Sequence, residues 1–169
     1  TREKALQELG SLAARVRGPL GDTTPESARL AAAETFTTSS VEGVKTYSQA
    51  QELQFAGRTA EALEAYKRTM QLDPEFGRAY SGAGIAAQRL GRDVEAQEFW
   101  KKALSLMDRM TPREKSRTLG GYYLTVARNY AQAIENYQAL VSAFPADRAG
   151  HVSLGHWALV GLAGFAVEF

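Results

Sequence analysis

The residue types that most often carry catalysis or bind a metal ion are few in this sequence, and they are poorly spaced. No cysteine is present among the 169 residues, which excludes thiolate catalysis, disulfides and cysteine-ligated zinc. The two histidines, His151 and His156, are five positions apart, whereas ligands that share one face of a helix lie three or four apart. We therefore predict no catalytic residue, no metal site and no cofactor, and we expect that the chain is not an enzyme.

Carboxylates are plentiful, but their positions indicate solvated surface and not acid–base chemistry. They fall on the outer faces or in the first turns of predicted helices, where a negative charge favours the helix dipole. The clearest examples are Glu61, Glu64, Asp93, Glu95 and Glu98. The run Ser81-Gly82-Ala83-Gly84 has the glycines of a phosphate-binding loop, yet it falls inside a predicted helix and not between a strand and a helix. We interpret these glycines as positions of close helix packing.

Positive charge is concentrated between Lys101 and Arg117. The basic residues of this segment are Lys101, Lys102, Arg109, Arg113, Lys115 and Arg117, against the acidic Asp108 and Glu114. An acidic partner could use such a segment, but aromatic residues that would stack on bases are not interleaved with it. The net charge of the whole chain is +1, which gives no general attraction to a polyanion. We therefore predict no nucleic-acid partner.

The composition is that of an ordinary globular protein. Hydrophobic residues make up 44% and charged residues 23%, which suits one domain or a short repeat array. No stretch approaches the roughly 18 apolar residues of a membrane span, so no membrane insertion is predicted. The start, Thr1-Arg2-Glu3-Lys4, has neither an initiator methionine nor the apolar core of a signal peptide. We expect a piece of a longer protein; a cytoplasmic location is favoured, with the soluble part of a membrane-anchored parent as the alternative.

The sequence repeats itself with a period of 34 to 37 residues, which constrains the fold more than any local propensity. A shift of 34 places Gly57 on Gly91 and Tyr66 on Trp100, and a further shift of 37 places Trp100 on Tyr137. Within each unit the apolar residues recur three and four positions apart, which is the spacing of one helix face. Each unit is therefore predicted to be two helices.

Glycines and prolines separate these predicted helices. Gly57 and Gly91 stand where the chain leaves a helix and a left-handed conformation is needed. Pro74 and Pro145 stand where the preceding helix cannot continue, because proline lacks the backbone N–H. These residues set the ends of the units.

Helix starts are indicated by two capping boxes, Ser39 with Glu42 and Thr111 with Glu114. Combined with the periodicity, they predict a helix near 5–17 and a short helix opened by Thr24-Pro25. The predicted pairs that follow are 40–56 with 59–72, 75–90 with 93–109 and 112–127 with 130–143, and a last helix begins at about 147.

The small and aromatic residues of each unit resemble those of the tetratricopeptide repeat. The matching residues are Ala62 with Tyr66 and Pro74, Ala96 with Trp100, Ala133 with Tyr137 and Pro145, and the glycines Gly84 and Gly155. The resemblance implies an all-α fold, an α–α superhelix of antiparallel helix pairs with the aromatic residues buried between units. Three extra residues around Met110 to Arg113 interrupt the period.

The predicted organisation has two parts. Residues 1–39 form an N-terminal helical segment that packs on the array, and residues 40–169 form the array itself. Full repeats are expected at 40–73, 74–110 and 111–146, and a truncated fourth at 147–169.

A narrower resemblance covers the residues before the array. The runs Ala5-Leu6-Gln7-Glu8-Leu9 and Thr37-Thr38-Ser39-Ser40-Val41-Glu42 look like the segment that precedes repeats in bacterial serine/threonine kinases and winged-helix regulators. The glycine-rich phosphate loop, the His-Arg-Asp motif and the Asp-Phe-Gly motif of kinases are not in the sequence. The resemblance implies a bacterial signalling protein as the parent, with this chain as its non-catalytic repeat region.

In tetratricopeptide repeats the first helix of each pair lines a concave groove. Carried over to this sequence, the groove positions are Tyr47, Gln51, Gln54, Arg78, Ser81, Ile85, Gln88, Arg89, Lys115, Thr118, Tyr122, Thr125 and His156. Such amides, cations and aromatics suit an extended or helical peptide that is held by side-chain hydrogen bonds. The family's clamp for a C-terminal carboxylate is not reproduced, because Tyr47, Gly82 and Leu119 stand where it needs other residues. The resemblance thus implies a protein-interaction module with a protein or peptide partner.

Two alternative functions stay open. The first is self-association of the parent, because the C-terminal stretch is almost uncharged and would leave apolar side chains in water. A homodimer would then form through Trp157, Leu159, Val160, Leu162 and Phe165. The second is a ligand-binding or catalytic domain hidden between residues 105 and 128, which would need a polar pocket there.

Overall fold

The computed structural model describes residues 36–38 and 40–155, and this part of the chain is all-α. Its α-helices are α3 (Val41–Phe55), α4 (Thr59–Leu72), α5 (Gly77–Arg89), α6 (Asp93–Ser105), α7 (Pro112–Thr125) and α8 (Tyr130–Ala143). A short 3-10 helix, η2 (Met107–Arg109), precedes α7, and a last helical stretch covers residues 148–155. The predicted helices agree closely with these bounds, apart from the one over 93–109. The two predicted before residue 36 lie outside the described residues.

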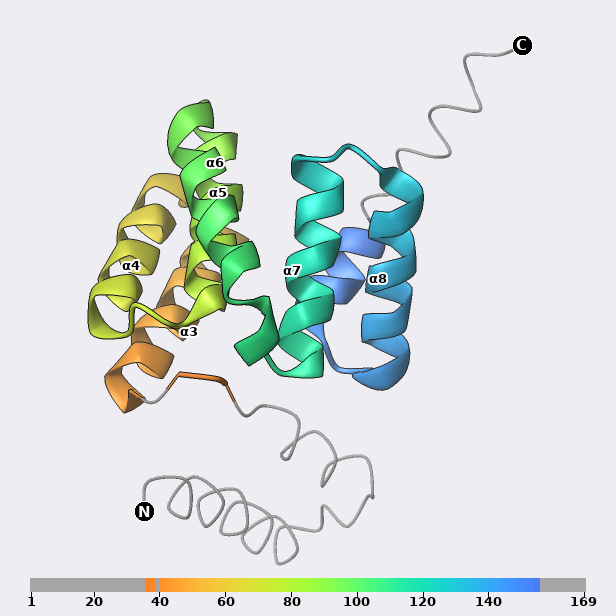
Figure 1. Ribbon diagram of the computed structural model, residues 1–169, viewed down its shortest axis with the longest axis horizontal. Coiled ribbons are helices and arrows are strands. Elements are labelled where there is room, and N and C mark those ends of the chain that lie inside the picture. Colours follow the sequence, from red (N-terminus) through yellow and green to blue (C-terminus); the bar gives the residue numbers. More distant parts are fainter. Residues whose placement is uncertain (1–35, 39, 156–169) are drawn as a thin grey trace, which may run out of the picture.

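Consecutive helices pack as pairs, α3 on α4, α5 on α6 and α7 on α8, and α5 also contacts α4 and α7 (Figure 1). The connection within each pair is short, so its two helices run antiparallel. Gly57 and Gly91, in the first two connections, have φ of 76° and 70°, which confirms the predicted left-handed turns. The third connection has Arg128 at this position, with φ of 51°.

The helix starts confirm one capping box and correct the other. Thr111 Oγ1 accepts from Glu114 N at 3.3 Å, and Glu114 Oε2 accepts from Thr111 N at 2.8 Å, as predicted for the start of α7. At α3 the capping residue is Ser40, whose Oγ accepts from Gly43 N at 3.0 Å. The prediction of Ser39 as the cap is therefore wrong by one residue, because two adjacent serines have the same capping propensity and the helix starts after the second.

Neighbouring helices approach closely where aromatic side chains face glycines. The three aromatic residues predicted between units are all buried: Tyr66, Trp100 and Tyr137. A Cβ atom built at Gly82 would lie 2.5 Å from Tyr66, and one built at Gly84 would lie 2.8 Å from Trp100. At Gly120 the corresponding distance to Tyr137 is 2.8 Å. These glycines make room for the rings, which confirms the interpretation of Gly82 and Gly84 as packing positions.

The helix predicted over 93–109 ends at Ser105. The η2 turn that follows directs Leu106 and Met110 into the interior, where both are buried. A Cβ atom built at Gly77, the first residue of α5, would lie 2.2 Å from the end of the Met110 side chain. The extra residues before α7 therefore form a packed turn against α5, and they do not lengthen α6.

Residues 36–38 lie against the helix pairs. The ring centroid of Phe36 lies 5.4 Å from that of Tyr47 and 6.0 Å from that of Phe76, and Thr38 Oγ1 donates to Asp73 Oδ2 at 2.6 Å. The rest of the predicted N-terminal segment, 1–35 and Ser39, lies outside the described residues. So do His156 and the predicted dimer edge, which comprises Trp157, Leu159, Val160, Leu162 and Phe165.

Candidate functional site

A cavity of about 400 Å³ opens between the helices that come first in each pair. Its walls come from α3, α5, α7 and the helical stretch 148–155, with one tyrosine from each of α4 and α8. The volume lies within the range of pockets that bind small ligands or a few peptide side chains, about 300–1,000 Å³. This cavity is the candidate site.

Part of the predicted groove lines this cavity. The predicted residues among its lining are Gln51, Gln54, Arg78, Ile85, Gln88, Arg89 and Thr125. Each comes from α3, α5 or α7, which are the helices that the resemblance assigned to the groove.

Other predicted groove residues are placed elsewhere. Tyr47, Ser81 and Thr118 have no exposed surface, so their assignment to an open groove is wrong. Their hydroxyl groups hold the side chain of Arg78. Lys115 and Tyr122 are half-buried and do not line the cavity. The ring of Tyr122 packs edge-on against Trp100, with the two centroids 5.9 Å apart.

Several lining residues were missed, and two of them are tyrosines that reach the cavity from second helices. Tyr66 of α4 and Tyr137 of α8 reach it beside Gly82 and Gly120, where no side chain blocks them. The others include Phe55, Arg117, Leu124, Val152 and Ser153. The signal available in the sequence was the presence of Gly82 and Gly120 inside predicted first helices, where the missing side chain leaves room for an aromatic ring of a neighbouring helix.

The cavity is positively charged. Arg78, Arg89 and Arg117 line it, and its lining includes no aspartate or glutamate. The net charge of the whole chain is +1, so the excess of cations at the cavity is a local feature. A site of this kind attracts anions, because low-dielectric walls strengthen the field of the arginines.

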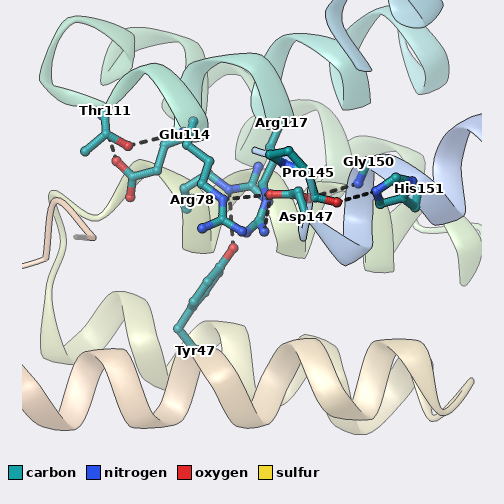
Figure 2. A network of polar contacts seen from close by, with 10 residues as sticks. Tyr47, Arg78, Thr111, Glu114, Arg117, Pro145, Asp147, Gly150 and His151 are labelled. Carbon is teal, nitrogen blue, oxygen red and sulfur yellow. Dashed lines mark hydrogen bonds and ion pairs between the residues drawn. The ribbon is translucent and has the colours of Figure 1, made fainter. Parts of the chain in front are cut away.

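Arg78 is a cation inside the helix packing, with 6% of its surface exposed. Its Nε donates to Tyr47 Oη at 3.3 Å, and its Nη1 donates to Ser81 Oγ at 2.7 Å and to Thr118 Oγ1 at 3.1 Å. Figure 2 shows the Tyr47 hydroxyl reaching it from α3. Burial would lower the pKa of Arg78, but electrostatic interactions with Tyr47, Tyr66 and Glu114 and the hydrogen bond to Tyr47 together raise it, so the side chain stays a cation.

Asp147 is the buried anion of the site, and its carboxylate holds two arginines (Figure 2). Its Oδ2 accepts from Arg113 Nε and from Arg117 Nε, each at 2.7 Å. Its Oδ1 accepts from Gly150 N at 2.9 Å and so caps the stretch 148–155. Burial would raise the pKa of Asp147, but the charge and hydrogen bonds of Arg117 lead the interactions that hold it below its usual value.

The same carboxylate pairs with two of the basic residues that the sequence concentrates between Lys101 and Arg117. Arg113 is buried and Arg117 is nearly so, and both are paired within the molecule. The anion that pairs with them stands 30 residues or more further along the chain, so the local charge pattern could not reveal it.

The first and last described helices contact each other beside the cavity. The guanidinium carbon of Arg148 lies 4.1 Å from the ring centroid of Phe55, and Arg148 Nη1 lies 3.3 Å from Glu52 Oε2. Phe55 lines the cavity, so this contact joins stretch 148–155 to α3 at the cavity edge.

Three further observations concern the class of protein. Within residues 36–38 and 40–155, no helix has the length and apolarity needed to cross a membrane. In the same residues, no three histidine, aspartate or glutamate side chains gather as a metal-binding group. No protein-family model matches the chain, and a search of curated proteins finds no match.

Proposed function

We propose that the chain is a protein-interaction module of the tetratricopeptide-repeat type, an α–α superhelix that binds a peptide segment of a partner in its cavity. The observation that carries the proposal is the origin of the cavity walls: four helices from successive units contribute to one site. A bound peptide would therefore contact every described unit at once, which is how repeat proteins use their inner surface.

The chemistry of the walls supports a peptide over a purely apolar ligand. Gln51, Gln54 and Gln88 offer amide donors and acceptors, as a peptide backbone requires, and Phe55 and Ile85 offer apolar surface. The cavity is thus suited to a segment that has both an exposed backbone and side chains.

We propose binding and not catalysis as the activity of this site. Its lining includes no aspartate, glutamate, histidine or lysine that could exchange a proton near neutral pH. Tyr66 and Tyr137 have phenol groups there, but burial is the leading cause of a raised pKa at both. The polar side chains that remain are hydrogen-bonding groups.

A display experiment tests the proposal. Random 12-residue peptides on phage would be selected against the full chain and then measured as synthetic peptides with an amidated C-terminus. Val152→Trp would place a large ring at the cavity, and it should weaken the selected peptides at least 10-fold. Val94→Trp is the matched control, because Val94 is exposed on α6 and does not line the cavity.

The two variants give opposite expectations. If the control weakened binding as much as Val152→Trp, the peptides would bind elsewhere. If no peptide were selected, the proposed function would fail.

A further inference from the structure

Arg78 and its surroundings indicate what the bound segment contains. The side chain lines the cavity, is almost fully buried, and donates hydrogen bonds to the neutral hydroxyls of Tyr47, Ser81 and Thr118. Among the described residues no carboxylate lies within ion-pair distance of it. A buried cation with neutral partners alone is costly, since hydroxyl groups do not replace the hydration that the charge has lost.

The two buried carboxylates of the described chain are engaged with other groups. Asp147 pairs with Arg113 and Arg117. Glu114 contributes to the electrostatic environment of Arg78, but its oxygens accept from Thr37 N at 3.2 Å, from the Thr37 hydroxyl and from Thr111 N. Neither carboxylate hydrogen-bonds Arg78, so a counter-anion for it would have to enter the cavity.

A second polar group of the same cavity lacks a hydrogen-bond partner. Gln88 donates its amide N–H to Thr125 O at 2.7 Å, while its Oε1 is buried and has no hydrogen-bond partner among the described residues. A buried acceptor without a donor costs free energy, and a ligand N–H would satisfy it. The cavity therefore lacks both an anion and an N–H donor.

We propose that the cavity binds an acidic peptide segment, in which the side-chain carboxylate of a glutamate or aspartate pairs with Arg78. The inference rests on the proposed function and names the chemical class of its ligand. A peptide supplies what the cavity lacks from two of its residues, because the side chain of one brings the carboxylate and the backbone of another brings an N–H for Gln88, which lies ten positions from Arg78 on α5. Arg89, also in the lining, would favour the same negative charge without taking the buried position, whereas Arg117 is already paired with Asp147.

The test uses the peptides selected against the full chain. Each acidic residue of a selected peptide is replaced in turn by its amide, Glu by Gln or Asp by Asn, with the C-terminus amidated throughout. One replacement should weaken binding roughly 10- to 100-fold, which is the usual range for a buried charge-assisted hydrogen bond. A further arm compares amidated and free C-termini, since a terminal carboxylate could reach Arg78 instead.

Variants of the chain then assign the effect to Arg78. In Arg78→Gln, the acidic peptide and its amide form should bind within about 3-fold of each other. Arg109→Gln is the control, because it removes the same charge from an exposed arginine that pairs with Glu75. The Arg109→Gln variant should prefer the acidic peptide over its amide form as strongly as the unaltered chain does.

A measurement on the unaltered chain covers the case in which Arg78→Gln does not fold. The Nε–H resonance of Arg78 should shift when a selected acidic peptide is added, and it should shift less with the amide form. Peptides that bind equally well in acid and amide forms would overturn the inference and leave the proposed function intact. An effect confined to the free C-terminus, or an unmoved Arg78 resonance, would overturn it too, whereas failure to select any peptide would count against the proposed function.

Discussion

The described chain has a first half, α3 to α6, and a second half, from α7 to residue 155. Phe76 and Asp147 occupy equivalent places in these halves, and they differ entirely in chemistry. Each stands two positions after a proline, directly before a helix, and each is fully buried. Phe76 packs edge-on against Tyr47, with centroids 4.8 Å apart, while Asp147 binds two arginines. The position must be filled, and either an aromatic cluster or an ionic one can fill it.

The turns within the helix pairs also differ between the two halves, with glycines in the first half and a charged residue in the second. In the first half the left-handed position belongs to Gly57 and Gly91, and in the second half it belongs to Arg128. The large apolar cluster of the molecule is likewise formed by residues of α3 to α6. The first half uses apolar side chains and glycines where the second half uses charged side chains, so the two halves should respond differently to mutation and to pH.

The largest effect is expected from Asp147→Leu. Removal of the carboxylate leaves the buried Arg113 and the nearby Arg117 without it, which should lower the free energy of unfolding by about 3–5 kcal/mol. The triple variant with Arg113→Met and Arg117→Met should regain most of this loss, because apolar residues can replace a buried ionic cluster. Both variants lack the helix cap, so their difference measures the charges alone. Urea denaturation is the measurement, and a single variant as stable as the unaltered chain would contradict the comparison.

A smaller effect is expected from acid. The pKa of Asp147 is lowered in the folded protein, so its ionised carboxylate stabilises the fold above the ordinary value of 3.8. That contribution is lost as the pH falls through the folded pKa, because the unfolded chain then binds the proton more tightly. Thermal melts between pH 2 and 6 should therefore show a steeper loss in the unaltered chain than in Asp147→Asn. Phe76→Ala, a variant of the apolar half, should keep the steep loss while being less stable at every pH.

The smallest effect is expected at the turns. Arg128→Gly should change the free energy of unfolding by less than about 1 kcal/mol and in the stabilising direction, because glycine adopts positive φ without strain. Gly91→Arg should destabilise the fold by about 1–2 kcal/mol, since a side chain in this conformation is strained. A Cβ atom at Gly91 would meet no atom within 4 Å, so the second result would report the backbone and not a clash. Changes in the free energy of unfolding that are equal in size for Arg128→Gly and Gly91→Arg would contradict the difference between the turns of the two halves.

The helical part of the fold could be predicted because its determinants are local. Apolar spacing placed the helices, Gly57 and Gly91 placed two turns, and the Thr111 box placed the start of α7. The end of α6 was not predictable in this way, because the burial of Met110 against Gly77 depends on how α5 and α7 come together.

The candidate site could be predicted only in part, because burial depends on which residues meet across units. Gln51, Gln88 and Arg89 line the cavity as expected for first-helix positions. Tyr47 faces the same way in the sequence pattern, yet its hydroxyl binds Arg78, which comes 31 residues later. The pairing of Asp147 with Arg117 at the cavity joins residues 30 positions apart, which no local pattern indicates.

The contact of Arg148 with Phe55 and Glu52 has a consequence for how the chain could vary in length. It joins residues 96 positions apart, whereas units of a linear repeat array contact their neighbours alone. Such a contact forms for one number of intervening helix pairs, because one more pair would carry stretch 148–155 away from α3. Duplication or deletion of a helix pair would therefore break this contact between α3 and stretch 148–155.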